Sequence, residues 1–277
     1  MKGSLTIRPR HSLAALAGAL ALIVSAVTLG GGDVYAAESS HHRWTSKPTI
    51  VLVHGAWADS SGWNGVISRL QAEGHPVVAA GLPLRGVAAD AAYLDGLLKT
   101  LNGPIVLVGH SYGAAVITNT AADPDVKALA YVSAVIPDQG ESVFDLAGRY
   151  AGSLIGPDTI QTVPLPSGDA DVYLRPVTFH RVFGADLPHQ VAARLAVTQR
   201  PVTNGALNEP SGAPAWKRLP SWAVVSRGDN VIPVAAQRFM TGRAGSRTVE
   251  INGSHATLIS HADAVAAVIR KAARATN

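Results

Sequence analysis

Apolar positions along the chain fall into short continuous runs, separated by turns and by stretches of helical spacing. The continuous run Thr49 to Val53 predicts a buried parallel strand. Further strands are predicted over Pro76 to Ala80, Ile105 to Val108, Val126 to Val135, Trp222 to Val225 and Arg247 to Ile251. Helical spacing predicts helices over Trp63 to Ala72, Ala88 to Leu101, Val234 to Thr241 and Ala262 to Ala273. This alternation is typical of the α/β class, here a doubly wound, mostly parallel six-stranded sheet.

The alternation breaks down between Pro137 and Pro220. This stretch has many turn residues, weak strand patterns over Val172 to Leu174 and Thr178 to Phe179, and one helical pattern over His189 to Thr198. A long irregular stretch inside a compact domain usually indicates an inserted functional element, and its apolar and aromatic content argues against a disordered linker. We therefore expect a cap, about residues 138–220, over the carboxyl ends of the strands, where such sheets bind ligands.

The first residues resemble an export signal. Basic residues precede an apolar run from Leu13 to Leu29, three glycines end the run, and Val34-Tyr35-Ala36 offers small residues at the spacing of a cleavage site. We expect residues 1–36 to be a signal peptide and residues 37–48 a flexible lead, so that the protein is secreted or extracytoplasmic without stable membrane insertion. The alternative is an uncleaved anchor, because the run is nearly long enough to span a bilayer.

Composition limits the other possibilities. The 277 residues are 47% apolar and 15% charged, which suits one globular domain over residues 49–277. The net charge of +4 would fall to about +2 after cleavage, and no basic patch with interleaved aromatics suggests a nucleic-acid partner. Cysteine is absent, which excludes disulfides and thiolate metal sites, and no histidines pair at metal-ligand spacing outside the polar start. We expect no cofactor or metal, and the oligomeric state stays open.

The most informative motif is Gly109-His110-Ser111-Tyr112-Gly113. A β-branched run enters it and an alanine-rich helical pattern, Ala114 to Ala122, leaves it. A serine at a sharp turn between a strand and a helix is held in a strained conformation that exposes its hydroxyl, and small residues are needed two positions to either side. The context favours Ser111 as a nucleophile over a purely structural turn.

A serine hydroxyl needs an adjacent base, and that base needs an acid to orient it. His255 follows the last predicted strand through Asn252-Gly253-Ser254 and is the expected base; His261, at the start of the final helix, is the alternative. Asp229 follows the Trp222 strand in a tight turn and is the expected acid; Asp138, which opens the cap, is the alternative.

An oxyanion formed at Ser111 would need preorganised N–H donors. We expect the backbone N–H groups of Tyr112 and Ala56, the latter because Gly55 lets the loop after the first strand approach the substrate. His54 and His110 lie in backbone-defined turns and are interpreted as structural. Trp57 is expected to contact the substrate, although Trp57 and Trp63 could equally pack in the core.

Together these motifs resemble one branch of the α/β-hydrolase superfamily, which contains plant methylesterases, plant hydroxynitrile lyases and bacterial carboxylesterase-like proteins. The resemblance rests on His54 to Trp63, on the turn Gly109 to Gly113 that carries Ser111 (the serine elbow), on Thr198-Gln199-Arg200-Pro201 and on Gly253-Ser254-His255. It extends from about Thr49 to Ala273. It implies the α/β-hydrolase fold and the chain order Ser111, Asp229, His255. The eight-stranded form of the fold has two further strands before Thr49, for which the short lead leaves no room.

The resemblance also bears on the reaction. Hydroxynitrile lyases of this type carry threonine after the first-strand histidine and lysine after the catalytic histidine, whereas this chain has Gly55 and Ala256. Both departures weaken the lyase interpretation, so we expect hydrolysis of small-molecule carboxylic esters through an acyl-enzyme. The composition of the cap suggests that the substrate is small to medium in size and mostly apolar. Lyase, lactonase or cofactor-free chemistry with the same residues, or a non-catalytic binding protein, are the alternatives. The identity of the ester is left open.

Overall fold

The computed structural model describes residues 47–120 and 123–276. The predicted signal peptide, residues 1–36, lies outside the described residues, and so does the predicted lead up to residue 46.

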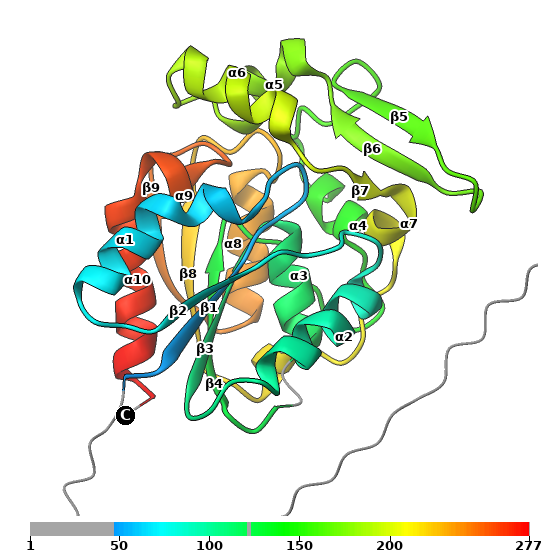
Figure 1. Cartoon of the computed structure of the whole chain (residues 1–277). Helices are drawn as coiled ribbons and strands as arrows, with labels where there is room; N and C mark the ends of the chain where they lie inside the picture. The colour runs from blue at the N-terminus through cyan, green and yellow to red at the C-terminus, as the bar shows by residue number, and fades with distance from the viewer. Residues whose placement is uncertain (1–46, 121–122, 277) are drawn as a thin grey trace, which may run out of the picture. The chain divides into compact units, whose positions relative to one another are not determined.

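A six-stranded sheet forms the centre of the molecule (Figure 1). Its strands lie in the order β2 (Val77–Ala80), β1 (Thr49–Val53), β3 (Ile105–His110), β4 (Val126–Val132), β8 (Ser221–Ser226) and β9 (Arg247–Ile251). Every neighbouring pair is parallel, which confirms the predicted six-stranded α/β sheet. The chain order reverses between β1 and β3, and the loops after these two strands therefore meet at the crevice where ligands bind in such folds.

Helices cover both faces of the sheet, as the alternating pattern requires (Figure 1). Helices α1 (Asn64–Ala72) and α10 (Ala262–Arg274) pack on one face, in a buried cluster that includes Leu70 and Ile269. Helices α2 (Val87–Leu98), α3 (Tyr112–Asn119) and α8 (Val234–Arg243) pack on the other. Strand β3 is buried throughout because both of its faces are covered, which explains its continuous apolar sequence.

The stretch between β4 and β8 forms the cap. Its elements are α4 (Val143–Gly148), β5 (Ile160–Pro164), β6 (Ala170–Leu174), α5 (Pro176–Phe183), α6 (His189–Thr198), β7 (Val202–Thr203), α7 (Asn204–Asn208) and a 3-10 helix, η2 (Ala215–Lys217). Strands β5, β6 and β7 form a separate antiparallel sheet. The prediction of a strand at Thr178 to Phe179 is wrong: Pro176 occupies the first turn of α5, where a missing N–H costs nothing, and the segment is helical.

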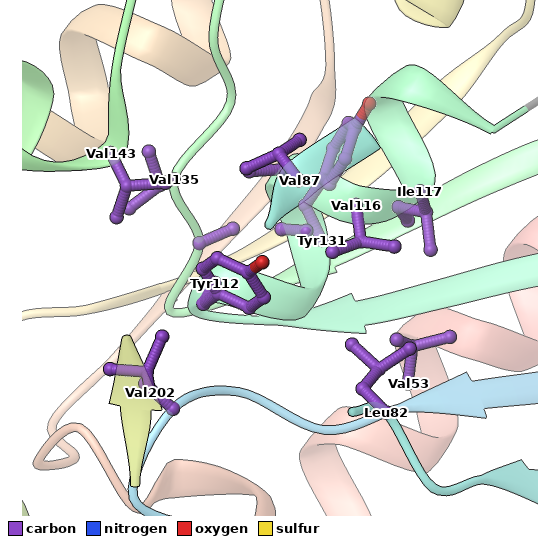
Figure 2. Packing of buried hydrophobic residues seen from close by; sticks show 14 of the residues in the cluster. Val53, Leu82, Val87, Tyr112, Val116, Ile117, Tyr131, Val135, Val143 and Val202 are labelled. Carbon is purple, nitrogen blue, oxygen red and sulfur yellow. The ribbon is translucent and has the colours of Figure 1, made fainter. Parts of the chain in front are cut away.

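The cap shares its core with the sheet. Val202 of β7 belongs to the same buried cluster as Tyr112 and Val116 of helix α3 (Figure 2). Gln199 adds polar contacts within the cap, because its amide both accepts from the N–H of Leu174 at 2.9 Å and donates to the Leu174 carbonyl at 2.8 Å. The cap is therefore packed against the elements that carry the predicted site.

Candidate active site

Ser111 occupies the turn between β3 and α3 in a strained conformation, with φ of 53° and ψ of −123°. Glycine is required two positions before and two positions after Ser111 because a side chain at either position would collide with neighbouring backbone. A Cβ on Gly109 would lie 2.6 Å from the Ala114 Cα, and a Cβ on Gly113 would lie 2.4 Å from the His54 carbonyl oxygen. A larger residue at position 113 would push helix α3 away from β1, and one at position 109 would push the start of α3 away from the end of β3. The sequence pattern therefore follows directly from packing.

The structure brings Ser111, His255 and Asp229 together although they are far apart in the sequence. The Ser111 Oγ and the His255 Nε2 are 2.8 Å apart, and the His255 Nδ1 lies 2.8 Å from the Asp229 Oδ2. The His255 ring and the Asp229 carboxylate are fully buried, whereas Ser111 retains 5% exposure and lines a cavity. A carboxylate on Nδ1 places the acceptor lone pair of the neutral ring on Nε2, where it faces the serine hydroxyl.

Asp229 is held by groups that the sequence did not indicate. Its Oδ1 accepts hydrogen bonds from the N–H groups of Val231 at 2.8 Å and Ile232 at 2.9 Å. Its Oδ2 accepts from the side-chain amide of Gln237, which is fully buried on helix α8, at 2.9 Å. Gln237 also accepts from the N–H of Ser226 at 3.0 Å and donates to the Ile232 carbonyl at 2.8 Å. The carboxylate is therefore fixed on both oxygens.

The two histidines interpreted as structural bond to the backbone. The His54 Nε2 accepts the N–H of Leu82 at 2.9 Å, and the His110 Nε2 lies 2.9 Å from the carbonyl oxygen of His255. Burial, together with the nearby His255, holds the pKa of His110 well below its usual range, so its ring is neutral and donates to that carbonyl. Thus His110 holds the backbone of His255.

The alternative base and acid lie elsewhere. The His261 ring contacts the Ser260 hydroxyl at 2.9 Å and the Asp186 carboxylate at 3.5 Å. Asp138 pairs with Lys217 at 2.6 Å. Neither residue makes a contact with Ser111 or His255 in the described structure, so the geometry favours the first choice at both positions.

The loop after β1 comes very close to the elbow. A Cβ on Gly55 would lie 2.7 Å from the Ser111 Cβ, which explains why this position is glycine. Ala56 and Tyr112 both line the cavity that contains Ser111. Tyr112 is the first residue of helix α3, so its N–H has no acceptor within the helix. Within the described chain the Ala56 N–H also has no acceptor, and both donors are available to a ligand at the serine.

The cavity in front of Ser111 has a volume of about 620 Å³, including its mouth. Its lining combines the elbow and the β1 loop with apolar residues of α4, the cap and the loop after β8, among them Val135, Val143, Ala147, Ile155, Leu207, Val231 and Ile232. No charged side chain lines it in the described residues. Such a surface favours an uncharged, apolar ligand.

The two tryptophans differ in their environment. Trp63 is fully buried and packs against the sheet, so it belongs to the core. Trp57 lines the cavity and is clamped by the cap: its N–H donates to the Arg200 carbonyl at 3.0 Å, and its indole N–H donates to the Val172 carbonyl at 2.9 Å. Its φ of 57° is unusual for a large side chain, which indicates that its orientation is imposed by these contacts.

Two further findings concern metal binding and membrane-spanning helices. Among the described residues, no group of three or more histidine, aspartate or glutamate side chains could hold a metal ion. None of the helices in the described ranges is long and apolar enough to cross a membrane.

Comparison with known proteins finds relatives that are named as hydrolases and esterases. A pyrethroid hydrolase from Sphingobium wenxiniae is 29% identical over 241 residues, which cover 79% of this chain and 85% of the relative. A carbendazim hydrolyzing esterase from Nocardioides is 32% identical over 114 residues, 35% of this chain; the match spans about half of that relative's length (46%). The solved structure of a pyrethroid hydrolase from Sphingobium faniae matches with a TM-score of 0.69 and 24% identity, covering 82% of this chain and 98% of that one.

The family model described as "Alpha/beta hydrolase family" matches residues 50–268, which is most of the chain and includes β1, the serine elbow and the loop of His255. With the six-stranded parallel sheet and its inserted cap, this match establishes that the chain belongs to the alpha/beta hydrolase family.

Proposed function

We propose that this protein is a secreted serine hydrolase that cleaves carboxylic esters of small to medium, mostly apolar substrates through an acyl-enzyme intermediate. One observation carries the proposal: the Ser111 Oγ, the His255 ring and the Asp229 carboxylate form a continuous chain of 2.8 Å contacts at the wall of an apolar cavity. The relatives named as a pyrethroid hydrolase and a carbendazim hydrolyzing esterase support the assignment to ester-like substrates.

The chemistry follows from the positions of these groups. His255 removes the proton of Ser111 through Nε2 as the oxygen attacks the ester carbonyl, and Asp229 stabilises the resulting imidazolium. The N–H groups of Ala56 and Tyr112 bind the oxyanion. His255 then protonates the leaving alcohol, and a water molecule repeats the cycle on the acyl-enzyme. A general base contributes about 10²–10⁴-fold and one oxyanion donor about 10²–10³-fold.

Trp57 limits the substrate on one side of this cavity. A second, mostly apolar cavity of about 360 Å³ lies beyond it, lined by Phe183, Leu195 and Leu258 among others. Trp57 is the residue that the two linings share in the described chain. We infer that its indole separates the two cavities, which supports a role of Trp57 in substrate binding and favours an acyl or alcohol group that fits the first cavity alone.

Hydrolysis is favoured over cyanohydrin cleavage by the residue that follows His255. Ala256 is fully buried, and its methyl group supplies no cation to stabilise a leaving cyanide. A lyase of the related type would need a fixed, buried cationic side chain at this position, whereas an ester hydrolase does not need one.

The proposed extracytoplasmic location rests on the leader pattern of residues 1–36. It is tested by sequencing the N-terminus of protein recovered outside the cytoplasm, which should begin near Ala37.

The activity is tested with a panel of p-nitrophenyl esters of increasing acyl length. The parent protein should hydrolyse the short and medium esters, and Ser111→Ala should lose at least about 10³-fold in kcat, since the nucleophile is removed. Ser68→Ala, an exposed serine on helix α1, is the matched control and should behave as the parent does. A Ser111→Ala variant with parental activity would rule out the proposal.

A further inference from the structure

Asp186 lies in the cap, in the short turn between helices α5 and α6, and it faces the loop that follows β9 and carries His255. Nothing in the proposed reaction uses this carboxylate. The side chain is 26% exposed, so it is neither fully buried nor free in solvent, and its surroundings explain where it points.

The carboxylate of Asp186 binds several groups of that one loop. It accepts a hydrogen bond from the backbone N–H of Ser254 at 3.1 Å and another from the Ser254 hydroxyl. It also accepts from the Ser260 hydroxyl at 2.7 Å, and the His261 ring lies 3.5 Å away. Asp186 is therefore attached to both ends of the segment 254–261, which begins as a loop and continues as the short helix α9 (Thr257–Ser260).

These contacts flank the predicted base directly. Ser254 precedes His255, and its hydroxyl also accepts the N–H of Ala256, the residue that follows, at 3.1 Å. The same Ala256 N–H lies 3.0 Å from the carbonyl oxygen of Phe183, at the end of cap helix α5. The Phe183 ring packs edge-on against the His255 ring, with the ring centres 5.0 Å apart. The position of His255 thus depends on cap residues on both sides.

The charge of Asp186 suits this role. Burial alone would raise its pKa, but the hydrogen bonds from Ser254 and Ser260 outweigh burial and leave the pKa below its usual range. The group is an ionised acceptor at neutral pH. Hydrogen bonds to an ionised acceptor are shorter and stronger than neutral ones, so the loop is held firmly.

We propose that Asp186 is a positioning residue for the reaction: it fixes the segment 254–261 so that the His255 Nε2 meets the Ser111 hydroxyl. This inference rests on the proposed function. It assigns the cap a part in the chemical step as well as in substrate binding. A misplacement of about 1 Å in a reacting group can cost about 10²-fold in rate. Loss of the hydrogen bonds of Asp186 should therefore reduce kcat more than it changes KM.

The test compares Asp186→Ala and Asp186→Asn with the parent, using p-nitrophenyl ester kinetics and the rate of labelling by a fluorophosphonate probe. Active sites are titrated, so that every rate constant refers to a competent site. Asp169→Ala is the matched control, because Asp169 is also a cap carboxylate that accepts backbone N–H groups, those of Ala170 and Gly205, away from the catalytic loop.

We expect Asp186→Ala to lower kcat and the labelling rate per titrated site by about 10–100-fold, with KM within about twofold. Asp186→Asn keeps one acceptor oxygen and should fall between Asp186→Ala and the parent, and Asp169→Ala should match the parent. If Asp186→Ala does not fold, Ser260→Ala removes one half-buried hydrogen-bond partner of Asp186 and should still lower both rates a few-fold.

If Asp186→Ala and the parent have equal rates per titrated site, the inference is wrong. This holds even if the variant has fewer active sites, because a loss of active sites alone would indicate a purely structural role of Asp186. Failure of the proposed function itself is distinguishable: there Ser111→Ala would remain active. A Ser111→Ala variant without activity beside a fully active Asp186→Ala would refute the positioning role alone.

Discussion

The side-chain amide of Gln237 donates a 2.9 Å hydrogen bond to the same carboxylate oxygen of Asp229 that contacts the His255 ring. This oxygen therefore has two donors, one of which does not take part in proton transfer. The amide keeps the carboxylate oriented whichever protonation state His255 has during the cycle. It also joins helix α8 to the end of β8, so the acid is fixed by packing as well as by its own loop.

Gln237→Leu should reduce both stability and turnover. The variant leaves the buried N–H of Ser226 without its side-chain acceptor and costs about 1–3 kcal/mol in free energy of unfolding. A fall in kcat of about 10-fold, equivalent to about 1.4 kcal/mol in the barrier, is expected because Asp229 loses an orienting contact. Urea unfolding and ester kinetics measure the two effects. Gln71→Leu, on the exposed part of helix α1, is the control, and a Gln237→Leu variant indistinguishable from it would contradict the assignment.

Gly55→Ala should abolish activity through a steric effect. Its Cβ would lie 2.7 Å from the Ser111 Cβ and 3.0 Å from the His110 carbonyl oxygen, so either the elbow or the loop that carries Ala56 must move. We expect a loss of at least about 10²-fold in kcat, the typical effect of losing one oxyanion donor. The comparison is Gly96→Ala in helix α2, where an added Cβ meets nothing within 4 Å. Equal kcat values for the two variants would show that the close approach is not needed.

Trp57→Gly should change substrate preference towards longer esters. Glycine adopts the φ of 57° without strain, and removal of the indole joins the first cavity to the second. The acyl-length optimum of the ester panel should move to longer chains. In the double variant Trp57→Gly with Leu195→Phe, the larger ring refills the second cavity and should move the optimum back. An unchanged optimum in a folded Trp57→Gly variant would mean that the indole does not separate the two cavities.

Asp90 offers a test of electrostatics at the elbow helix. It is fully buried and accepts the Tyr112 hydroxyl at 2.8 Å, and burial raises its pKa above the ordinary value of 3.8. The folded state therefore binds this proton more tightly than the unfolded state does, so the contribution of Asp90 to stability declines as pH rises from about 4 through its folded pKa.

Asp90→Asn removes that titration while keeping an acceptor for Tyr112. The difference in melting temperature between this variant and the parent should shift in favour of the variant between pH 4 and pH 7. Asp90→Ala removes the acceptor of the buried Tyr112 hydroxyl proton and should be less stable than Asp90→Asn across the range. Thermal unfolding at several pH values measures both effects, and a pH-independent difference between Asp90→Asn and the parent would refute the assignment.

Much of the site could be predicted from the sequence because backbone geometry constrains it. The elbow motif needs glycines at positions 109 and 113, and the residues after β3, β8 and β9 lie at one edge of a parallel sheet, which brings Ser111, Asp229 and His255 within reach of one another. The strands and most helices could be predicted from their apolar patterns, because the spacing of apolar residues reflects which faces of each element are buried.

Gln237 and Asp186 could not be found in this way. Each contacts its partner through tertiary packing, with no fixed spacing in the sequence: Gln237 lies in an ordinary helix, and Asp186 lies in a cap whose path the apolar pattern does not reveal. The strand prediction for Thr178 to Phe179 is wrong because β-branched and aromatic residues favour strands, whereas Pro176 begins a helix there.

The intact mass of the protein after treatment with a fluorophosphonate shows whether His255 activates Ser111 for covalent chemistry. We expect one adduct in the parent protein, located on Ser111 by peptide mapping, and no adduct under the same conditions in Ser111→Ala or His255→Ala. An adduct on another residue, or undiminished labelling of Ser111 in His255→Ala, would contradict this expectation.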